Sequence, residues 1–187
     1  MRIIAGKFKG HPLAASRGLA VRPTSDKARQ ALFNILGAGV EGGAFLDLFA
    51  GTGAVGLEAL SRGAVVVTAV ETHPETAIKN AAKLGATPAQ GYTLIQGDIF
   101  KITGKLAAER RRFDFIFADP PWDAGLQTRI VAAAAPLLAA EGRLVLELNR
   151  RTAPPDGAPH GLALTESRRY GEAIFRFYQR SESQTLI

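Results

Sequence analysis

The 187-residue chain contains no cysteine, one tryptophan and one methionine, and these shortages narrow its chemistry. Without thiols there is no disulfide bond, no thiolate zinc site and no cysteine nucleophile. No run of about 20 apolar residues occurs, so no membrane span is expected. The first residues also lack the long apolar core of a signal peptide. We therefore expect a cytoplasmic protein.

Acidic residues are scarce in the N-terminal fifth of the chain. Residues 1–40 hold seven basic groups and one acid, whereas the other 147 residues hold 16 of each, so the whole net charge of +6 lies at this end. Such asymmetry favours a basic face for a polyanion beside a neutral body. A solvated basic surface without a partner is the alternative. The basic residues are Arg2, Lys7, Lys9, Arg17, Arg22, Lys27 and Arg29.

The hydrophobic content of 47% and the length suit one domain with a full core and a small appendage. Residues 1–15 are expected to form a short hairpin. A helix should follow over residues 25–36, with Thr24 or Ser25 as its cap and Gly37 after its end. We therefore predict an N-terminal hairpin and helix over residues 1–40, and a larger domain over residues 41–187.

From residue 44, apolar runs alternate with amphipathic segments. Repeated strand–helix units of this kind predict a parallel sheet covered on both faces. The expected strands are 44–49, 65–70, 92–96, 113–118 and 143–148, and the expected helices are 54–62, 74–84, 102–111 and 125–139. Two further extended segments, 162–169 and 172–179, have no helix between them. They should add an antiparallel hairpin at one edge, giving a seven-stranded, mainly parallel α/β sheet.

A glycine motif follows the first long strand. Gly51, Gly53 and Gly56 match G-x-G-x-x-G between a strand and a helix, and Glu71 follows the second strand. Glycines let the backbone approach a ligand, and a carboxylate at the position of Glu71 can bind both hydroxyls of a ribose. The combination predicts a nucleoside-containing cofactor.

Two further acids bear on which nucleoside cofactor is bound. Asp47, near the glycine turn, would repel a pyrophosphate but attract the ammonium of S-adenosylmethionine. Asp98, after the third strand, can accept from the adenine amino group while Ile99 or Phe100 packs on the ring. As alternatives, Asp47 accepts from loop amides and Asp98 only caps the next helix. The acids favour S-adenosylmethionine over NAD, although an NAD-binding oxidoreductase or sensor stays open.

The fourth strand is followed by Asp119-Pro120-Pro121-Trp122. Two prolines make a stiff, extended loop whose carbonyl groups stay free as acceptors. A carboxylate, carbonyl acceptors and an aromatic face suit a flat ring that carries an amino group, such as a nucleobase. The alternative is a loop with a capping acid and a core aromatic.

Together these residues resemble a Rossmann-fold, class I amino-methyltransferase. The motifs that carry the resemblance are Asp47-x-Phe49-x-Gly51-x-Gly53, Glu71, Gly97-Asp98 and Asp119-Pro120-Pro121-Trp122. The N-terminal segment narrows it to the RsmD family, through Arg2-Ile3-Ile4-Ala5-Gly6, Arg22-Pro23-Thr24-Ser25-Asp26-Lys27-x-Arg29 and Ala31-Leu32-Phe33-Asn34-Ile35-Leu36. One departure is Trp122, because such loops more often carry Phe or Tyr.

The resemblance implies methyl transfer from S-adenosylmethionine to N2 of a guanine in 16S ribosomal RNA, with S-adenosylhomocysteine as product and without a metal. The partner would be ribosomal RNA or a partly assembled small subunit, and a monomer is the default. A methyltransferase for adenine or cytosine of RNA or DNA, and a pseudo-enzyme that only binds RNA, stay open. Expected cofactor contacts are Asp47, Phe49, Gly51, Gly53, Glu71, Asp98 and Ile99. Expected catalytic residues are Asp119, Pro120, Pro121 and Trp122, and expected RNA contacts are Lys7, Lys9, Arg22 and Arg29.

Overall fold

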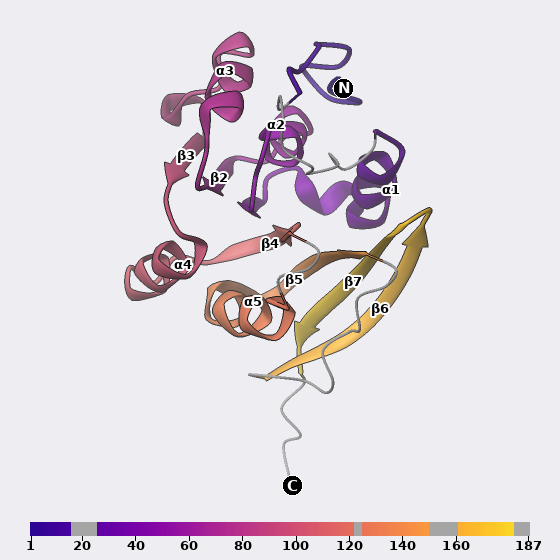
Figure 1. Ribbon diagram of the computed structural model, residues 1–187, viewed down its shortest axis with the longest axis vertical. Helices are drawn as coiled ribbons and strands as arrows, with labels where there is room; N and C mark the ends of the chain where they lie inside the picture. The colour runs from indigo at the N-terminus through magenta and orange to yellow at the C-terminus, as the bar shows by residue number, and fades with distance from the viewer. Residues whose placement is uncertain (16–25, 122–124, 150–160, 182–187) are drawn as a thin grey trace, which may run out of the picture.

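A single seven-stranded sheet organises the chain in the computed structural model, which describes residues 1–15, 26–121, 125–149 and 161–181 (Figure 1). The strands lie in the order β3-β2-β1-β4-β5-β7-β6. Their bounds are β1 Ala44–Leu48, β2 Val66–Glu71, β3 Tyr92–Gln96, β4 Phe113–Ala118, β5 Leu138–Asn149, β6 Leu162–Tyr170 and β7 Ala173–Arg180.

The first five strands pair in parallel, whereas β7 runs antiparallel to both β5 and β6. This confirms the predicted mainly parallel sheet with an antiparallel hairpin edge. Strands β1 and β4 are apolar over most of their length because helices cover both of their faces.

Helices pack against the two faces of the sheet and bury two apolar clusters. Leu32 and Leu57 lie in one cluster, and Leu106 and Ile130 lie in the other. The α-helices are α1 Asp26–Leu36, α2 Ala54–Ser61, α3 Glu75–Lys83, α4 Ile99–Ala108 and α5 Gln127–Ala134. Three short 3₁₀ helices are η1 Gly37–Val40, η2 Pro88–Gln90 and η3 Ala135–Leu137.

The bounds of two predicted helices, 102–111 and 125–139, differ from those observed. Helix α4 begins at Ile99 rather than residue 102, because the Asp98 side chain accepts a hydrogen bond from the Lys101 N–H at 3.0 Å and caps the helix. Helix α5 ends at Ala134 rather than residue 139. Pro136 lacks the N–H that a continuing helix needs, and β5 then starts five residues earlier than predicted.

Residues 1–15, which we call the N-terminal arm, were predicted to form a short hairpin, and they form a tight turn closed by a single antiparallel bridge. Arg2 and Pro12 make an isolated antiparallel bridge, and the Ile3 N–H donates to the His11 carbonyl at 3.0 Å. Ile3 and Leu13 are buried in the same apolar cluster as α1 and α2. The arm is thus packed onto the sheet domain through a shared core.

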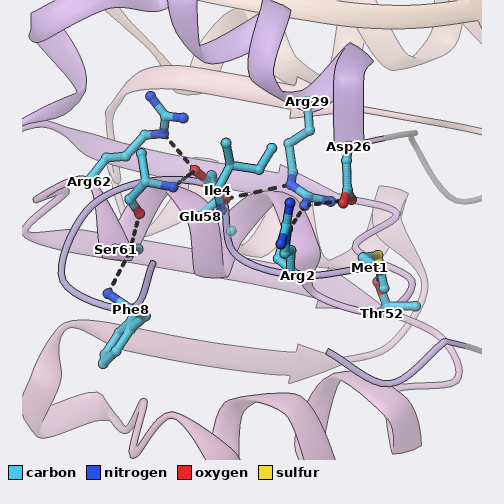
Figure 2. Close-up of polar contacts among 12 residues, drawn as sticks. Met1, Arg2, Ile4, Phe8, Asp26, Arg29, Thr52, Glu58, Ser61 and Arg62 are labelled. Atoms are coloured by element: carbon cyan, nitrogen blue, oxygen red, sulfur yellow. Dashed lines mark hydrogen bonds and ion pairs between the residues drawn. The ribbon is translucent and has the colours of Figure 1, made fainter. Parts of the chain in front are cut away.

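The buried Glu58 side chain of α2 holds the arm in place (Figure 2). Its two carboxylate oxygens accept from the backbone N–H groups of Ile4 at 2.7 Å and Ala5 at 3.0 Å. Arg62 Nε donates to the same carboxylate at 2.8 Å, and Arg29 Nε lies 3.7 Å from it. A buried carboxylate is stable only with such partners, so arm, α1 and α2 are joined at one point.

The turn of the arm lies at the C-terminal end of α2. The Lys7 N–H donates to the Ser61 carbonyl at 2.8 Å, and the Phe8 N–H donates to the Ser61 hydroxyl at 3.0 Å. Because α2 runs away from the glycine motif at its start, this turn lies at the far end of the helix from that motif.

Gly6 provides a test of arm docking, with Gly10 as its control. Both have positive φ, +80° and +86°, so alanine strains the backbone equally, by about 1–2 kcal/mol. A Cβ on Gly6 would lie 1.8 Å from the Ser61 carbonyl oxygen, whereas nothing lies within 4 Å of one on Gly10. We expect Gly6→Ala to lower the free energy of unfolding in urea well beyond Gly10→Ala. Equal losses would show that the arm does not dock on α2.

Candidate active site

The predicted cofactor and catalytic residues that the structure describes lie at one edge of the sheet. Strands β1 to β4 are parallel, so their carboxyl ends share this edge. After β1 the chain continues to β2 on one side of β1, whereas β4 pairs with the other side of β1. The space beyond the carboxyl ends of β1 and β4 is therefore a topological switch point. Ligands of open α/β sheets bind at such crevices.

The backbone is strained where β1 enters the glycine loop. Phe49 has φ of +61°, a conformation that costs a non-glycine residue energy and that clusters at functional sites. Its side chain is half-buried and packs on the cluster that contains Ile99. With this conformation at Phe49 the chain turns sharply at the end of β1 and leads into Gly51.

Glu71 lies directly beside the glycine loop. One carboxylate oxygen accepts from the Gly51 N–H at 2.7 Å, and the other accepts from the N–H groups of Thr72 at 2.8 Å and His73 at 3.0 Å. These bonds fix the orientation of the carboxylate. The fold therefore brings Glu71 beside the glycine motif, and its predicted contact with ribose hydroxyls stays a prediction.

Asp47 is the buried acid of the site. Its Oδ2 accepts from the Gly56 N–H at 2.8 Å, and a Cβ on Gly56 would lie 3.1 Å from that oxygen, so helix α2 approaches the strand closely only because this residue is glycine. Burial raises the pKa of Asp47 to about 7; the Gly56 hydrogen bond opposes the shift, and the charges of Asp119 and Glu71 add to it. Three carboxyl groups therefore share one electrostatic environment that favours a cation.

The residues predicted to hold adenine lie in different surroundings in the structure. Asp98 caps α4 through one oxygen, as the alternative in the sequence had it, while standing at the carboxyl end of β3. Ile99 is 4% exposed and packs in the core. Phe100 is half-buried, and the Arg129 guanidinium covers its ring at 3.6 Å from the centroid.

Asp119 lies one residue beyond β4. Its N–H donates to the Leu48 carbonyl at 3.4 Å, which ties the loop to the end of β1, and its side chain is half-buried. Pro120 is buried and Pro121 is exposed. Trp122 lies outside the described residues. The geometry thus places the Asp119 carboxyl group within electrostatic reach of Asp47, at the switch point.

Comparison with known proteins identifies the family of this chain. A family described as conserved hypothetical protein 95 matches residues 1–179. Ribosomal RNA small subunit methyltransferase D of Escherichia coli K12 is 32% identical over 185 residues, which are 96% of this chain and 90% of that protein. The chain belongs to the RsmD family.

Solved structures support the same assignment. YhhF from Escherichia coli superposes with a TM-score of 0.80 at 32% identity, covering 97% of this chain and 98% of that one. SMU.776, solved in complex with SAH, has a TM-score of 0.69 at 13% identity, covering 84% of this chain and 50% of that one. The second likeness concerns the fold alone.

The predicted RNA contacts of this RsmD-family chain are not all at the surface. Lys7 and Lys9 are exposed on the turn of the arm. Arg29 is fully buried, donates to the Arg2 carbonyl and pairs with Asp26 at 3.1 Å. A guanidinium without exposed surface cannot bind a phosphate from solution, so the RNA contact predicted for Arg29 is not retained. Arg22 lies outside the described residues.

Sequence reasoning missed Asn80, which joins the arm to the glycine loop. This buried amide donates to the carbonyl groups of Thr52 at 2.9 Å and Ala14 at 3.1 Å, and it accepts from the Ala14 N–H at 2.7 Å. Its spacing from Ala77 and Ala81 places it on the buried face of α3. That position was a readable signal, because a buried amide needs partners.

Within the described ranges, no group of three or more His, Asp or Glu side chains is placed to hold a metal ion. In the same part of the chain, no helix has both the length and the apolar character needed to cross a membrane.

The raised pKa of Asp47 predicts a pH effect on stability. The folded pKa of about 7 lies above the usual 3.8, so the folded state binds the extra proton between these values. This group therefore stabilises the fold at low pH, and its contribution falls by up to about 1.4 kcal/mol per unit as pH rises toward 7. We expect Asp47→Asn to unfold at higher urea than wild type at pH 8 and to lose this dependence. If the free energy of unfolding falls with pH as steeply in Asp47→Asn as in wild type, the raised pKa of Asp47 is contradicted.

Proposed function

We propose that this protein transfers a methyl group from S-adenosylmethionine to the exocyclic N2 amine of a guanine in 16S ribosomal RNA, acting as a monomer in the cytoplasm. The observation that carries the proposal is the position of Asp119, at the switch point and in the electrostatic environment of Asp47 and Glu71. The substrate class is supported by the Escherichia coli relative, whose name is ribosomal RNA small subunit methyltransferase D.

The chemistry of the site fits S-adenosylmethionine better than NAD. Asp47 is buried against neutral groups and other acids, an arrangement that an ammonium would relieve and a pyrophosphate would worsen. Glu71 stands against Gly51, where it would accept from both ribose hydroxyls. Gly51, Gly53 and Phe49 would line the cofactor, with Asp98 at its adenine end, and the buried Ile99 would support that end from the core. When bound, S-adenosylmethionine supplies an electrophilic methyl on a sulfonium.

Asp119 is the residue that acts on the guanine amine. That nitrogen is a poor nucleophile because its lone pair is delocalised into the ring. Asp119 and the Pro120 carbonyl would accept from its two N–H groups, hold it in line and stabilise the positive charge that develops on it. Pro121 keeps the loop extended, and Trp122 would stack on the base. A sulfonium is already an activated leaving group, so these contacts need no metal.

A paired guanine cannot reach this loop, so the target must be single-stranded or flipped out of its helix. The arm and α1 would form the RNA-facing extension, with Lys7, Lys9 and Arg22 on the backbone. Lys7 and Lys9 lie at the end of α2 away from the glycine loop, so their phosphates would belong to RNA distant from the target base.

The product identifies the function directly. Purified protein would be offered 16S RNA, partly assembled small subunits and DNA of the same sequence, and digested nucleosides would be analysed by mass spectrometry. We expect N2-methylguanosine in RNA or subunits. Methylated adenine or cytosine, or better activity on DNA, would replace the proposed substrate, and tight NAD binding without S-adenosylmethionine binding would reject the methyltransferase.

Asp119→Ala should lower kcat by at least about 100-fold, because it removes both the acceptor and the charge at the amine. Its affinity for S-adenosylmethionine, measured by calorimetry, should stay near that of wild type. Asp119→Asn is the matched control, since it keeps an oxygen acceptor without the charge, and should lose less activity. Wild-type turnover in Asp119→Ala would reject the amine-binding role.

Replacing Lys7 and Lys9 together by Ala should weaken RNA binding and flatten its salt dependence by about one unit for each lost phosphate contact. Affinity for S-adenosylmethionine should not change, because both side chains lie away from the cofactor loop. RNA titrations at several salt concentrations measure the slope. A slope equal to that of wild type would remove the arm's turn from the RNA interface.

A further inference from the structure

The turn of the β6–β7 hairpin lies at the same edge of the sheet as Asp119 and the two prolines that follow it. Strand β7 begins at Ala173, opposite Asn149 at the end of β5, and β6 ends at Tyr170 opposite the same alanine. Because β5 is parallel to β4, this turn and Asp119 lie at one edge. Figure 1 shows the turn reaching past the ends of β4 and β5, on the side of α1.

Strand register sets the distance between the hairpin and the target base. One row of the sheet crosses Ala118, Leu146, Arg176 and Ser167, one strand after another. Neighbouring strands are about 4.8 Å apart, so the backbone at Arg176 is about 10 Å from that at Ala118, next to Asp119. A stacked strand advances about 3.4 Å per nucleotide, so about three nucleotides of RNA would span the distance from Asp119 to the hairpin.

Two arginines share one face of the hairpin. Arg169 is paired with Ile174, and Arg176 is two residues farther along β7, so the two arginines are diagonal neighbours with Cβ atoms about 7–8 Å apart. Arg168 is directed to the opposite face and is ion-paired with Glu166. One face of the hairpin thus carries the ion-paired Arg168, and the other face carries the two positive charges of Arg169 and Arg176.

That pair has no acidic partner within the described part of the chain. Neither Arg169 nor Arg176 forms an ion pair there, and Glu172 in the turn forms none either. The Nε of Arg176 is buried and lacks a hydrogen-bond acceptor. Two neighbouring cations and a buried, unpaired N–H make an arrangement that an anion would complete.

We propose that Arg169 and Arg176 bind a backbone phosphate of the RNA substrate beside the methylated nucleotide. The guanidinium fork matches two phosphate oxygens, and the Ser167 hydroxyl opposite Arg176 supplies a further donor. The contact rests on the proposed function, because it assumes that the target base lies at Asp119. It gives the RNA a second point of attachment, on the side of the site away from β2 and β3.

Arg169→Ala, Arg169→Lys and Arg176→Gln test this site, with Arg112→Ala as the matched control. Arg112 is also exposed, but it lies just before β4, at the opposite edge of the sheet. RNA dissociation constants would be measured over a salt series. We expect Arg169→Ala and Arg176→Gln to weaken binding about tenfold at low salt and to reduce the slope by about one, with Arg169→Lys between them and wild type.

The affinity for S-adenosylmethionine and kcat at saturating RNA should stay at wild-type values in these variants. A slope for Arg169→Ala equal to that of Arg112→Ala would overturn the proposal. If Arg176→Gln lowers the melting temperature, the exposed Arg169 decides the result. Failure of wild type to methylate any RNA would reject the proposed function, whereas active wild type with unchanged slopes would reject only the phosphate site.

Discussion

The buried carboxylate of Glu58 is the constraint on which the rest of the structure depends. Removing such a charge from water costs several kcal/mol unless its oxygens are well paired. Here the partners come from three separate segments: the arm through Ile4 and Ala5, α1 through Arg29, and α2 itself through Arg62. The same helix begins directly after Gly53, so the bonds that fix the arm also fix the helix that follows the glycine motif.

The opposite situation holds at the carboxyl edge, where Asp47 keeps a single hydrogen bond and two acidic neighbours. The protein tolerates this unfavourable charge because the surrounding apolar strands supply the stability of the fold. Glu58 is compensated within the protein by Arg29, Arg62 and two backbone N–H groups. The Asp47 carboxyl group has one hydrogen bond and a pKa that burial raises to about 7, so its charged form would gain from a cationic ligand. This contrast between two buried acids, 11 residues apart in sequence, distinguishes a structural carboxylate from one suited to binding.

Patterns local in sequence predicted most of the fold. Apolar strands that alternate with helices predicted the sheet, because their pattern depends on spacing along the chain. The structure also brings Glu71 beside Gly51 of the glycine motif, and the cofactor role of these residues stays a prediction. Burial of Arg29 was not predictable, because it depends on Glu58, 29 residues later, and on a backbone carbonyl from the arm. The early start of α4 was readable from Asp98, because an aspartate at this position suits a helix cap as well as the adenine contact that was predicted for it.

Asn80 has a consequence for engineering. Its amide couples the exit of the arm to the glycine loop through bonds that only an amide of that length makes. The arm therefore depends on the domain that carries it. If it were grafted onto another methyltransferase, its lysines would be transferred without the side chains of α2 and α3 that hold the arm in place. A functional transplant has to carry Glu58, Ser61 and Asn80 along with residues 1–15. The arm, α2 and α3 thus form one structural unit.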